Sequence, residues 1–321
     1  MYWLGIDIGS ISTDLVVLND ENKVEKALYL KTGSRPAEAV REGLRLLGKD
    51  YESSQVGGVG VTGSGRNLGS AIAGGDVVKN EITAHARAVA AMDEEIRTVI
   101  EIGGQDSKII LMEDGLVSDF AMNTVCAAGT GSFLDRQAAR MGVSIEELGD
   151  MAASAKESAT IAGRCAVFAE SDLIHKQQAG VREDALMAGM CRALAMTYMS
   201  NVAKGKKVKP KICFQGGVAA NKGMRKAFEE LLGEEVMVPK EHKIMGAMGA
   251  AIIAREKSSG RTGFKGFETG DKEICLSEKS CGGCSNNCSV TAVMAGGREH
   301  GFYGDICGKY SSLTFMKNRI D

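Results

Sequence analysis

Short apolar runs that end in glycine alternate with longer segments of helical spacing along the first third of the chain. The opening run YWLGIDIG and the run VGGVGVTG at 56–63 are typical of buried strands. Pro36 suits the first turn of a helix that ends near Leu47, and further helices are predicted after Gly65 and over residues 81–93. These elements would complete a first lobe.

The remainder of the chain is richer in helical patterns. Residues 116–122 predict a strand, and Ser144 with Glu147 predicts a capping box at the start of a helix. A long helix over residues 184–203 carries several methionines, which we interpret as core filling. Residues 211–233 predict a strand, a double glycine and a helix. The small-residue run at 244–254 suits a helix packed closely between lobes, and 255–266 is typical of a linker.

The chain contains an internal repeat. Residues 6–20 (IDIGSISTDLVVLND) and 100–114 (IEIGGQDSKIILMED) align without a gap, sharing Gly9 with Gly103 and Asp20 with Asp114. Each copy predicts a strand, a glycine turn and a second strand. One such hairpin is more often a plain turn than a binding site, but the duplication favours a function.

A glycine turn of this kind can bind phosphate. Glycine lets the backbone approach a ligand, and the exposed N–H and hydroxyl groups point outward. Two copies in opposing lobes could hold one polyphosphate between them. Asp7, with Glu101 or Asp106, would then lie near its magnesium ion.

Two cysteines precede segments of helical spacing. Cys126 lies in NTVCAAGTG before residues 132–142, and Cys165 lies in GRCAVFAESDLIHKQQAG. The positive end of a helix dipole lowers the pKa of a thiol, so both positions favour thiolates that attack a substrate or bind a metal. Cys191 and Cys213 lie in apolar surroundings and are predicted to be buried core thiols.

Composition excludes several functions. With 321 residues and a net charge of −2, the chain is large enough for two lobes and lacks the basic surface of a nucleic-acid or membrane-binding protein. No basic and apolar leader opens the chain, and no apolar run is long enough to span a bilayer. We therefore expect a cytoplasmic protein. Nine cysteines in a reducing compartment indicate metal or redox chemistry.

The motifs DIGSxST, EIGGQDSK and FQGGVAAN resemble, in this order, the phosphate-1, phosphate-2 and adenosine motifs of the actin, heat-shock chaperone and sugar kinase superfamily. The resemblance implies an α/β fold of the actin-like, ribonuclease H-like class, with an ATP cleft between two lobes. MNxxCAAGTGxFLD and CxVFAESDLI are narrower and resemble the ATP-dependent activators of 2-hydroxyacyl-CoA dehydratases, relatives of the benzoyl-CoA reductase ATPase subunits. The likeness covers residues 3–256. We expect lobe I at 1–95, lobe II at 96–256 and an accessory tail at 257–321.

This resemblance implies a cofactor set and partners. Gln105 or Asp106 would orient magnesium or the attacking water. Cys126 and Cys165 of each of two protomers would bind one [4Fe–4S] cluster at a homodimer interface. A partner dehydratase or reductase would accept the electron, and ferredoxin or flavodoxin would supply it. The positions that match the ATP or ADP motifs are Asp7, Gly9, Ser10, Ile11, Ser12, Thr13, Asp14, Gly103, Gly104, Gly216, Gly217, Val218 and Asn221.

The chain departs from that family in three places. Asp14 stands where many members carry a basic residue, and Thr124 and Val125 replace a polar, charged pair. The third departure is the tail, which resembles segments of fused activases and of relatives that serve double-cubane-cluster reductases. Its density of thiols predicts a site for iron–sulfur or for zinc. The tail cysteines are Cys275, Cys281, Cys284, Cys288 and Cys307.

Two other functions fit part of this pattern. A small-molecule kinase of the same fold, with a structural zinc tail, would use Asp106 as a base. A nucleotide-sensing regulator would hydrolyse no ATP. The paired helix-mouth cysteines favour the electron-transfer ATPase over the kinase, and a measurable ATPase rate without an acceptor substrate would count against the regulator.

Overall fold

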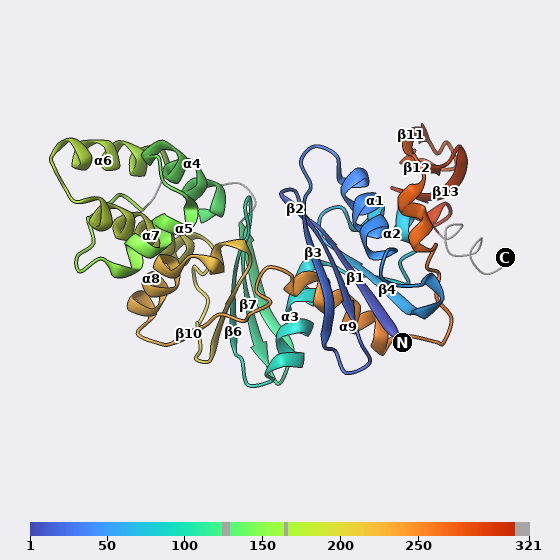
Figure 1. Ribbon diagram of the computed structural model, residues 1–321, viewed down its shortest axis with the longest axis horizontal. Helices are drawn as coiled ribbons and strands as arrows, with labels where there is room; N and C mark the ends of the chain where they lie inside the picture. Colours follow the sequence, from blue (N-terminus) through green and yellow to red (C-terminus); the bar gives the residue numbers. More distant parts are fainter. Residues whose placement is uncertain (124–128, 164–165, 312–321) are drawn as a thin grey trace. The chain divides into compact units, whose positions relative to one another are not determined.

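The computed structural model describes residues 1–123, 129–163 and 166–311, without the side chains of Ala166 and Val167. The chain divides into two compact units (Figure 1). Unit 1 is Met1–Ala88 with Ile244–Asp321, and unit 2 is Val89–Lys243. Helix α3 (Glu81–Met92) carries the chain from the first unit to the second.

Each unit has a five-stranded sheet of the same topology. The order is β3-β2-β1-β4-β5 in unit 1 and, counted from the opposite edge, β10-β9-β6-β7-β8 in unit 2. In unit 1, β1 is antiparallel to β2 and parallel to β4; in unit 2, β6 is antiparallel to β7 and parallel to β9. The duplication seen in the sequence therefore extends over whole sheets. The strands of unit 1 are β1 (Tyr2–Ile8), β2 (Ser12–Leu18), β3 (Val24–Lys31), β4 (Val56–Thr62) and β5 (Val77–Val78); those of unit 2 are β6 (Thr98–Ile102), β7 (Ser107–Glu113), β8 (Leu116–Asn123), β9 (Ile212–Gln215) and β10 (Val236–Met237).

The sheet of unit 1 is buried on both faces. Alternate residues of β1 and β2 pack with α1 (Pro36–Leu47) and α2 (Arg66–Ala73) in one apolar cluster. On the opposite face Trp3 and its neighbours pack against α9 (Met245–Glu256). A methyl group at Gly5 would lie 1.9 Å from the carbonyl oxygen of Ala247, so only glycine allows the helix to approach this closely.

Unit 2 packs helices against its sheet around an aromatic centre. Tyr198, Phe214 and Phe228 are buried and make edge-to-face contacts. The predicted capping box is confirmed, because the Ser144 hydroxyl accepts from the Glu147 N–H at 3.1 Å. No helix in the described ranges is long and apolar enough to cross a membrane. The helices are α4 (Gly131–Met141), α5 (Ile145–Ser154), α6 (Ala166–Gln178), α7 (Glu183–Asn201), η3 (Gly217–Ala220) and α8 (Lys222–Leu232).

The unit boundaries differ from those expected from the sequence. Helix α9 was expected in the second lobe, whereas it packs on β1 and β4 of unit 1, since its small residues meet glycines there. The tail is also part of unit 1. After the short helix η4 (Phe267–Asp271), it forms a separate sheet of β11 (Ile274–Ser280), β12 (Ser289–Ala295) and β13 (Arg298–Tyr303). Another short helix, η1 (Ser53–Gln55), precedes β4.

The tail sheet shares the core of unit 1. Ile274 and Val293 belong to the same apolar cluster as β1, and His300 Nε2 donates to the Ile72 carbonyl oxygen at 2.8 Å. Burial and the nearby Lys265 ammonium lower the pKa of His300 to about 4, so its ring is neutral in this contact. The predicted linker is bound to the unit as well, because Asp76 accepts hydrogen bonds from it.

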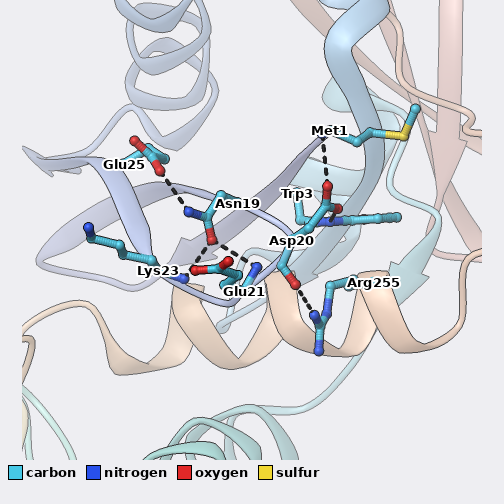
Figure 2. A network of polar contacts seen from close by, with 8 residues as sticks. All are labelled: Met1, Trp3, Asn19, Asp20, Glu21, Lys23, Glu25 and Arg255. Carbon is cyan, nitrogen blue, oxygen red and sulfur yellow. Dashed lines mark hydrogen bonds and ion pairs between the residues drawn. The ribbon is translucent and has the colours of Figure 1, made fainter.

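A polar network surrounds the turn between β2 and β3 in unit 1 (Figure 2). Asp20, in the turn between β2 and β3, accepts from the indole N–H of Trp3 and from the Met1 ammonium, both at 3.0 Å. Arg255 of α9 donates to the carbonyl oxygen of Asp20. The Trp3 and ammonium donors hold the pKa of Asp20 below its usual value. The repeated aspartate thus lies in a hairpin turn, where Asp20 holds the chain's first residues to the sheet.

Candidate functional site

The first phosphate hairpin is a closed turn between β1 and β2. The N–H of Gly9 donates to the carbonyl oxygen of Ser12 at 2.8 Å. Thr13 is fully buried, and its hydroxyl meets that of Thr32, which in turn donates to the carbonyl oxygen of Gly9, each at 2.8 Å. The side chain of Thr13 therefore supports the turn from behind. Ser10 and Ile11 form its exposed tip.

Two carboxyl groups face each other at the base of this hairpin. Asp7 on β1 and Asp14 on β2 are directly paired across the strands. Asp14 is 5% exposed, its Oδ2 accepts from the Ser12 hydroxyl at 3.3 Å, and its Oδ1 has no hydrogen-bond partner among the described residues. Burial, and secondarily the charge of Asp7, raises the pKa of Asp14 to about 9. At neutral pH the pair therefore carries a proton.

The second hairpin repeats the turn with the opposite charge at its base. The N–H of Gly103 donates to the carbonyl oxygen of Asp106 at 3.0 Å. Lys108, which aligns with Asp14, binds Glu101 at 2.9 Å and Asp106 at 2.8 Å. The Lys108 and Glu101 side chains are 3% and 6% exposed. Lys108 thus binds both acids that the sequence placed near magnesium and offsets one of their two negative charges, while Gln105 is exposed.

A second loop contacts each hairpin from the end of the neighbouring strand. Gly63 follows β4 and Gly216 follows β9, each with φ of +90°. A methyl group would lie 2.4 Å from the carbonyl oxygen of Ile8 at the first position and 2.4 Å from that of Ile102 at the second. Positive φ and this close approach both require glycine. The Gly63 loop is therefore the counterpart in unit 1 of the adenosine motif.

The adenosine motif itself is partly buried. Gly217 is exposed, whereas Val218 belongs to the apolar core of unit 2. Asn221 is 7% exposed, and its Oδ1 accepts from the Met224 N–H at 3.0 Å, which caps α8. His242 holds the loop through bonds to the backbone of Gly216 at 2.8 and 2.9 Å. Gly216 is buried, so of the predicted adenosine residues Gly217 offers the exposed backbone that could meet a nucleotide.

The helix that follows the first predicted cluster cysteine is joined to the second hairpin. Cys126 and Cys165 lie outside the described residues, but α4 and α6 follow them. The first amides of α4, those of Gly131 and Ser132, donate to the carbonyl oxygens of Gly103 and Gly104 at 2.9 and 3.0 Å. The turn that would bind phosphate is thus bonded directly to the helix after Cys126.

Two further contacts organise the segment before Cys165. Asp172 of α6 accepts from the N–H of Ala162 at 2.9 Å, and Thr197 of α7 donates to the carbonyl oxygen of Gly163. Arg136 of α4 binds Glu170 of α6 at 3.1 Å, which joins the two cysteine-adjacent helices. The two motifs that are separate in sequence are therefore part of one packed layer of unit 2.

The other cysteines divide into core and tail groups. Cys191 and Cys213 are buried, and burial raises the pKa of each thiol to about 12, which confirms the prediction of core thiols. In the tail Cys275, Cys284 and Cys307 are exposed. Within the described ranges no three His, Cys, Asp or Glu side chains lie close enough together to hold a metal ion.

Four contributors to these sites were not singled out in the sequence. They are Thr32, Gly63, Lys108 and His242. The ungapped repeat already contained one signal, since it aligns Asp14 with Lys108. Gly63 could have been found by aligning VTGS at 61–64 with FQGG at 214–217, since each segment lies at the end of a predicted strand. Thr32 and His242 act through contacts with distant segments, and the local sequence gives no signal for them.

The sequence profile of the BadF/BadG/BcrA/BcrD ATPase family matches residues 4–254. The chain is 34% identical over 262 residues to the (R)-2-hydroxyglutaryl-CoA dehydratase activating ATPase of Acidaminococcus fermentans, covering 81% of this chain and 99% of that protein. It is 33% identical to the 2-hydroxyisocaproyl-CoA dehydratase activator of Clostridioides difficile, over 80% of this chain and 96% of the other. A component of the benzoyl-CoA reductase of Thauera aromatica is 29% identical over 77% of this chain and 91% of its own length.

Solved structures give the same result. The activator of 2-hydroxyisocaproyl-CoA dehydratase from Clostridium difficile, with bound ADPNP, matches with a TM-score of 0.73 and 32% identity, over 80% of this chain and 96% of that chain. A ROK family glucokinase from Streptomyces griseus matches with a TM-score of 0.51 at 13% identity, over 80% and 100%. At that identity the second likeness concerns the fold alone, and it confirms the predicted actin-like fold class.

Proposed function

The chain belongs to the BadF/BadG/BcrA/BcrD ATPase family, and on that premise we propose that it hydrolyses ATP to deliver a low-potential electron to a partner dehydratase or reductase. The names of the relatives support a partner of this class. One observation within this chain carries the proposal. The second phosphate hairpin and the helix after Cys126 share two backbone hydrogen bonds.

The two hairpins bind the nucleotide through their backbone. Gly9, Ser10, Ile11 and Ser12 offer the exposed turn of unit 1, and Gly103 with Gly104 offers that of unit 2. A magnesium ion would neutralise phosphate charge beside Asp7. The orphaned Oδ1 of Asp14 fits a neighbouring proton or cation.

Gln105 and Asp106 act on the water that attacks the phosphate. Gln105 is exposed at the tip of the second hairpin. Asp106 is 32% exposed and hydrogen-bonded to Lys108, so its carboxylate is held in one orientation. A group held in this way can orient water without being a strong base. We assign Gln105 to contact with the water and Asp106 to its positioning.

The backbone bonds between hairpin and helix couple the nucleotide to the cysteines. When phosphate contacts change the backbone at Gly103 and Gly104, the amides of Gly131 and Ser132 must follow or lose their acceptors. Helix α4 transmits that movement to the segment containing Cys126, and the Arg136 to Glu170 pair transmits it to α6. ATP hydrolysis then makes the movement directional.

Cys126 and Cys165 of each of two protomers supply the thiolates for one [4Fe–4S] cluster, which would serve as the one-electron carrier. Two ligands from one chain leave the set of four incomplete, so this assignment requires a homodimer. The N-termini of α4 and α6 favour the charged form of thiolates placed before them. Ferredoxin or flavodoxin is the proposed donor.

Iron analysis of the anaerobically purified protein tests this function. Apart from any metal bound in the tail, we expect about four iron and four sulfide per dimer, and an electron paramagnetic resonance signal of the interface cluster after reduction. Cys126→Ala and Cys165→Ala should each abolish both, while Cys275→Ala, at an exposed position outside the proposed cluster, should not alter the interface signal. A dimer without iron that phosphorylates a small molecule would instead favour the kinase alternative.

A further inference from the structure

We propose that Cys281, Cys284, Cys288 and Cys307 form one tetrathiolate metal site at one end of the tail sheet, and that Cys275 is not a ligand. The family match ends at residue 254, so this sheet lies beyond the region shared with the ATPase family. The site is therefore a separate addition to unit 1. It is independent of the proposed interface cluster.

The sheet topology brings the four cysteines to the same end. Residues 281–288 connect β11 to β12. Because β13 is antiparallel to β12, Tyr303 at its end pairs with Thr291 near the start of β12. A methyl group at Gly304 would lie 2.5 Å from the carbonyl oxygen of Ser289. The chain that leaves β13 towards Cys307 therefore starts beside the loop that carries the other three.

The same topology separates Cys275 from this group. Cys275 pairs with Met294 near the far end of the sheet, whereas Ser280 pairs with Ser289 at the loop. Along one strand the separation between positions 275 and 280 is about 17 Å at ~3.4 Å per residue. Thiolate ligands bind zinc at about 2.3 Å, so Cys275 is too far away to share an ion with the loop.

The loop is folded back on itself. The N–H of Cys281 donates to the carbonyl oxygen of Cys288 at 2.8 Å, and the N–H of Asn287 donates to that of Cys284 at 3.1 Å. A methyl group at Gly283 would lie 3.3 Å from Cys281 Sγ and 3.8 Å from Lys309 Nζ. The loop therefore faces the segment that contains Cys307.

The segment around Cys307 is also a closed turn. Asp305 accepts hydrogen bonds from the N–H groups of Tyr310 and Ser311 at 2.7 and 3.1 Å. Tyr310 then packs, together with Cys281, against the small apolar cluster that contains Cys288. Two of the four thiols and the aromatic ring that follows the fourth thus share one cluster.

Positive charge collects at this end of the sheet. Lys279 Nζ lies 5.0 Å from the ring centre of Phe302 and 5.1 Å from that of Tyr310, and Lys309 Nζ lies 5.9 Å from Tyr310. Four thiols that bind one divalent ion release four protons, and the resulting complex has a charge of −2. Two ammonium groups beside the site would offset that charge.

Metal binding requires a local closure. The described side chains do not bring three such ligands together, but Cys284 and Cys307 are exposed and Cys281 is partly so. Their side chains can therefore rotate without disturbing the core. Among the described residues, the apolar cluster at this end has four buried members, Cys288, Val290, Ala292 and Phe302. A metal would thus add a cross-link where apolar burial is small.

Cobalt titration of the full chain tests the ligand set. The starting protein carries Cys126→Ser and Cys165→Ser, which removes the proposed interface ligands. We expect one Co²⁺ per chain, with thiolate charge-transfer and tetrahedral bands. Cys284→Ser and Cys307→Ser, both at exposed positions, should each lose the tetrahedral spectrum, whereas Cys275→Ser should retain it. Thermal unfolding of each variant checks that it is folded.

The outcomes separate cleanly. Loss of the spectrum with Cys275→Ser, its retention with Cys284→Ser and Cys307→Ser, or no bound metal in the starting protein would each overturn the proposal. Metal analysis of the protein as purified, and anaerobic reconstitution with iron and sulfide, identify the native occupant. Zinc and an iron–sulfur cluster both support the ligand set if substitution of the same four cysteines removes them.

Discussion

Replacing Asp14 with asparagine should stabilise unit 1 at neutral pH. The Asp14 carboxyl is buried opposite Asp7, and one of its oxygens has no hydrogen-bond partner among the described residues. Asparagine has nearly the same shape and carries no charge at any pH. The substitution therefore removes a titration from the folded state and leaves the packing of the hairpin intact.

The size of the effect follows from the two pKa values of Asp14. Its pKa is 3.8 when exposed and about 9 in the fold. At pH 7 the folded chain holds a proton that the unfolded chain has released, which costs about 1.4 kcal/mol for each of ~3 pH units, or ~4 kcal/mol. The folded state binds more protons between these two values. Its free energy of unfolding therefore falls as pH rises from about 4 to about 9 and is unaffected by this group outside that window.

The only tryptophan of the chain provides the assay. Trp3 is buried in β1 of unit 1, so its fluorescence follows the unfolding of that unit. Urea unfolding should be measured from pH 5 to 8 without nucleotide or divalent metal. Asp14→Asn should unfold at higher urea than the wild type at pH 7, and its stability should depend less on pH. Asp50→Asn, at an exposed position in the same unit, is the control. Identical pH dependence in the wild type and Asp14→Asn would refute the assignment of the buried proton.

Two other substitutions test the second hairpin. Lys108→Met leaves the buried Glu101 carboxylate without its 2.9 Å ammonium partner, so we expect a loss of ~3–5 kcal/mol in the stability of unit 2. Adding Glu101→Gln should restore most of it; equal instability of the single and double variants, measured by urea unfolding followed by circular dichroism, would contradict the pairing. Ser132→Pro removes the N–H that donates to the carbonyl oxygen of Gly104, in the first turn of α4 where proline is tolerated. We expect Ser132→Pro to retain ATPase activity but to lose most of the effect of nucleotide on electron transfer. The control Ser132→Ala keeps the N–H and should retain both properties. Similar coupling in the two variants would exclude this contact as the link.

Features encoded within a short segment were predictable from the sequence. The glycine turns of both hairpins form as expected, because each turn is closed by a bond between residues three apart. The helix from Pro36 to Leu47 and the Ser144 capping box are confirmed for the same reason. The fold class was also accessible, since the duplicated hairpins define the first two strands of both sheets.

Features that depend on distant contacts were not predictable. The small residues of α9 are compatible with packing between lobes or within one, and Gly5 and Gly60 decide the matter because they leave room for its backbone. The side chain of Asn221 appeared available for a ribose, but it caps α8. The tail was expected to be an accessory segment, yet its apolar residues complete the core of unit 1. For α9 and the tail the partner is far away in the sequence, whereas Asn221 caps its own helix through Met224, three residues on, which is a local signal that the sequence already contained.

Asp14 and Lys108 occupy equivalent positions in the two hairpins, and they show how the duplicated copies have diverged. One copy has two facing carboxyl groups and the other has a buried ion pair at the same positions. The first can exchange a proton or cation, whereas in the second the Lys108 ammonium is already bound to Glu101 and Asp106. This difference suggests that nucleotide binding perturbs the two hairpins unequally. The hairpin that is bonded to α4 is the one with the fixed ion pair.

The most direct test of the account is the midpoint potential of the proposed iron–sulfur cluster with each nucleotide. The potential should be measured anaerobically in the wild-type protein with ADP and then with a non-hydrolysable ATP analogue. Because the second hairpin is bonded to the helix after Cys126, the account predicts a shift of at least about 60 mV, equivalent to tenfold for one electron. Equal potentials with both nucleotides, or no reducible centre, would contradict it.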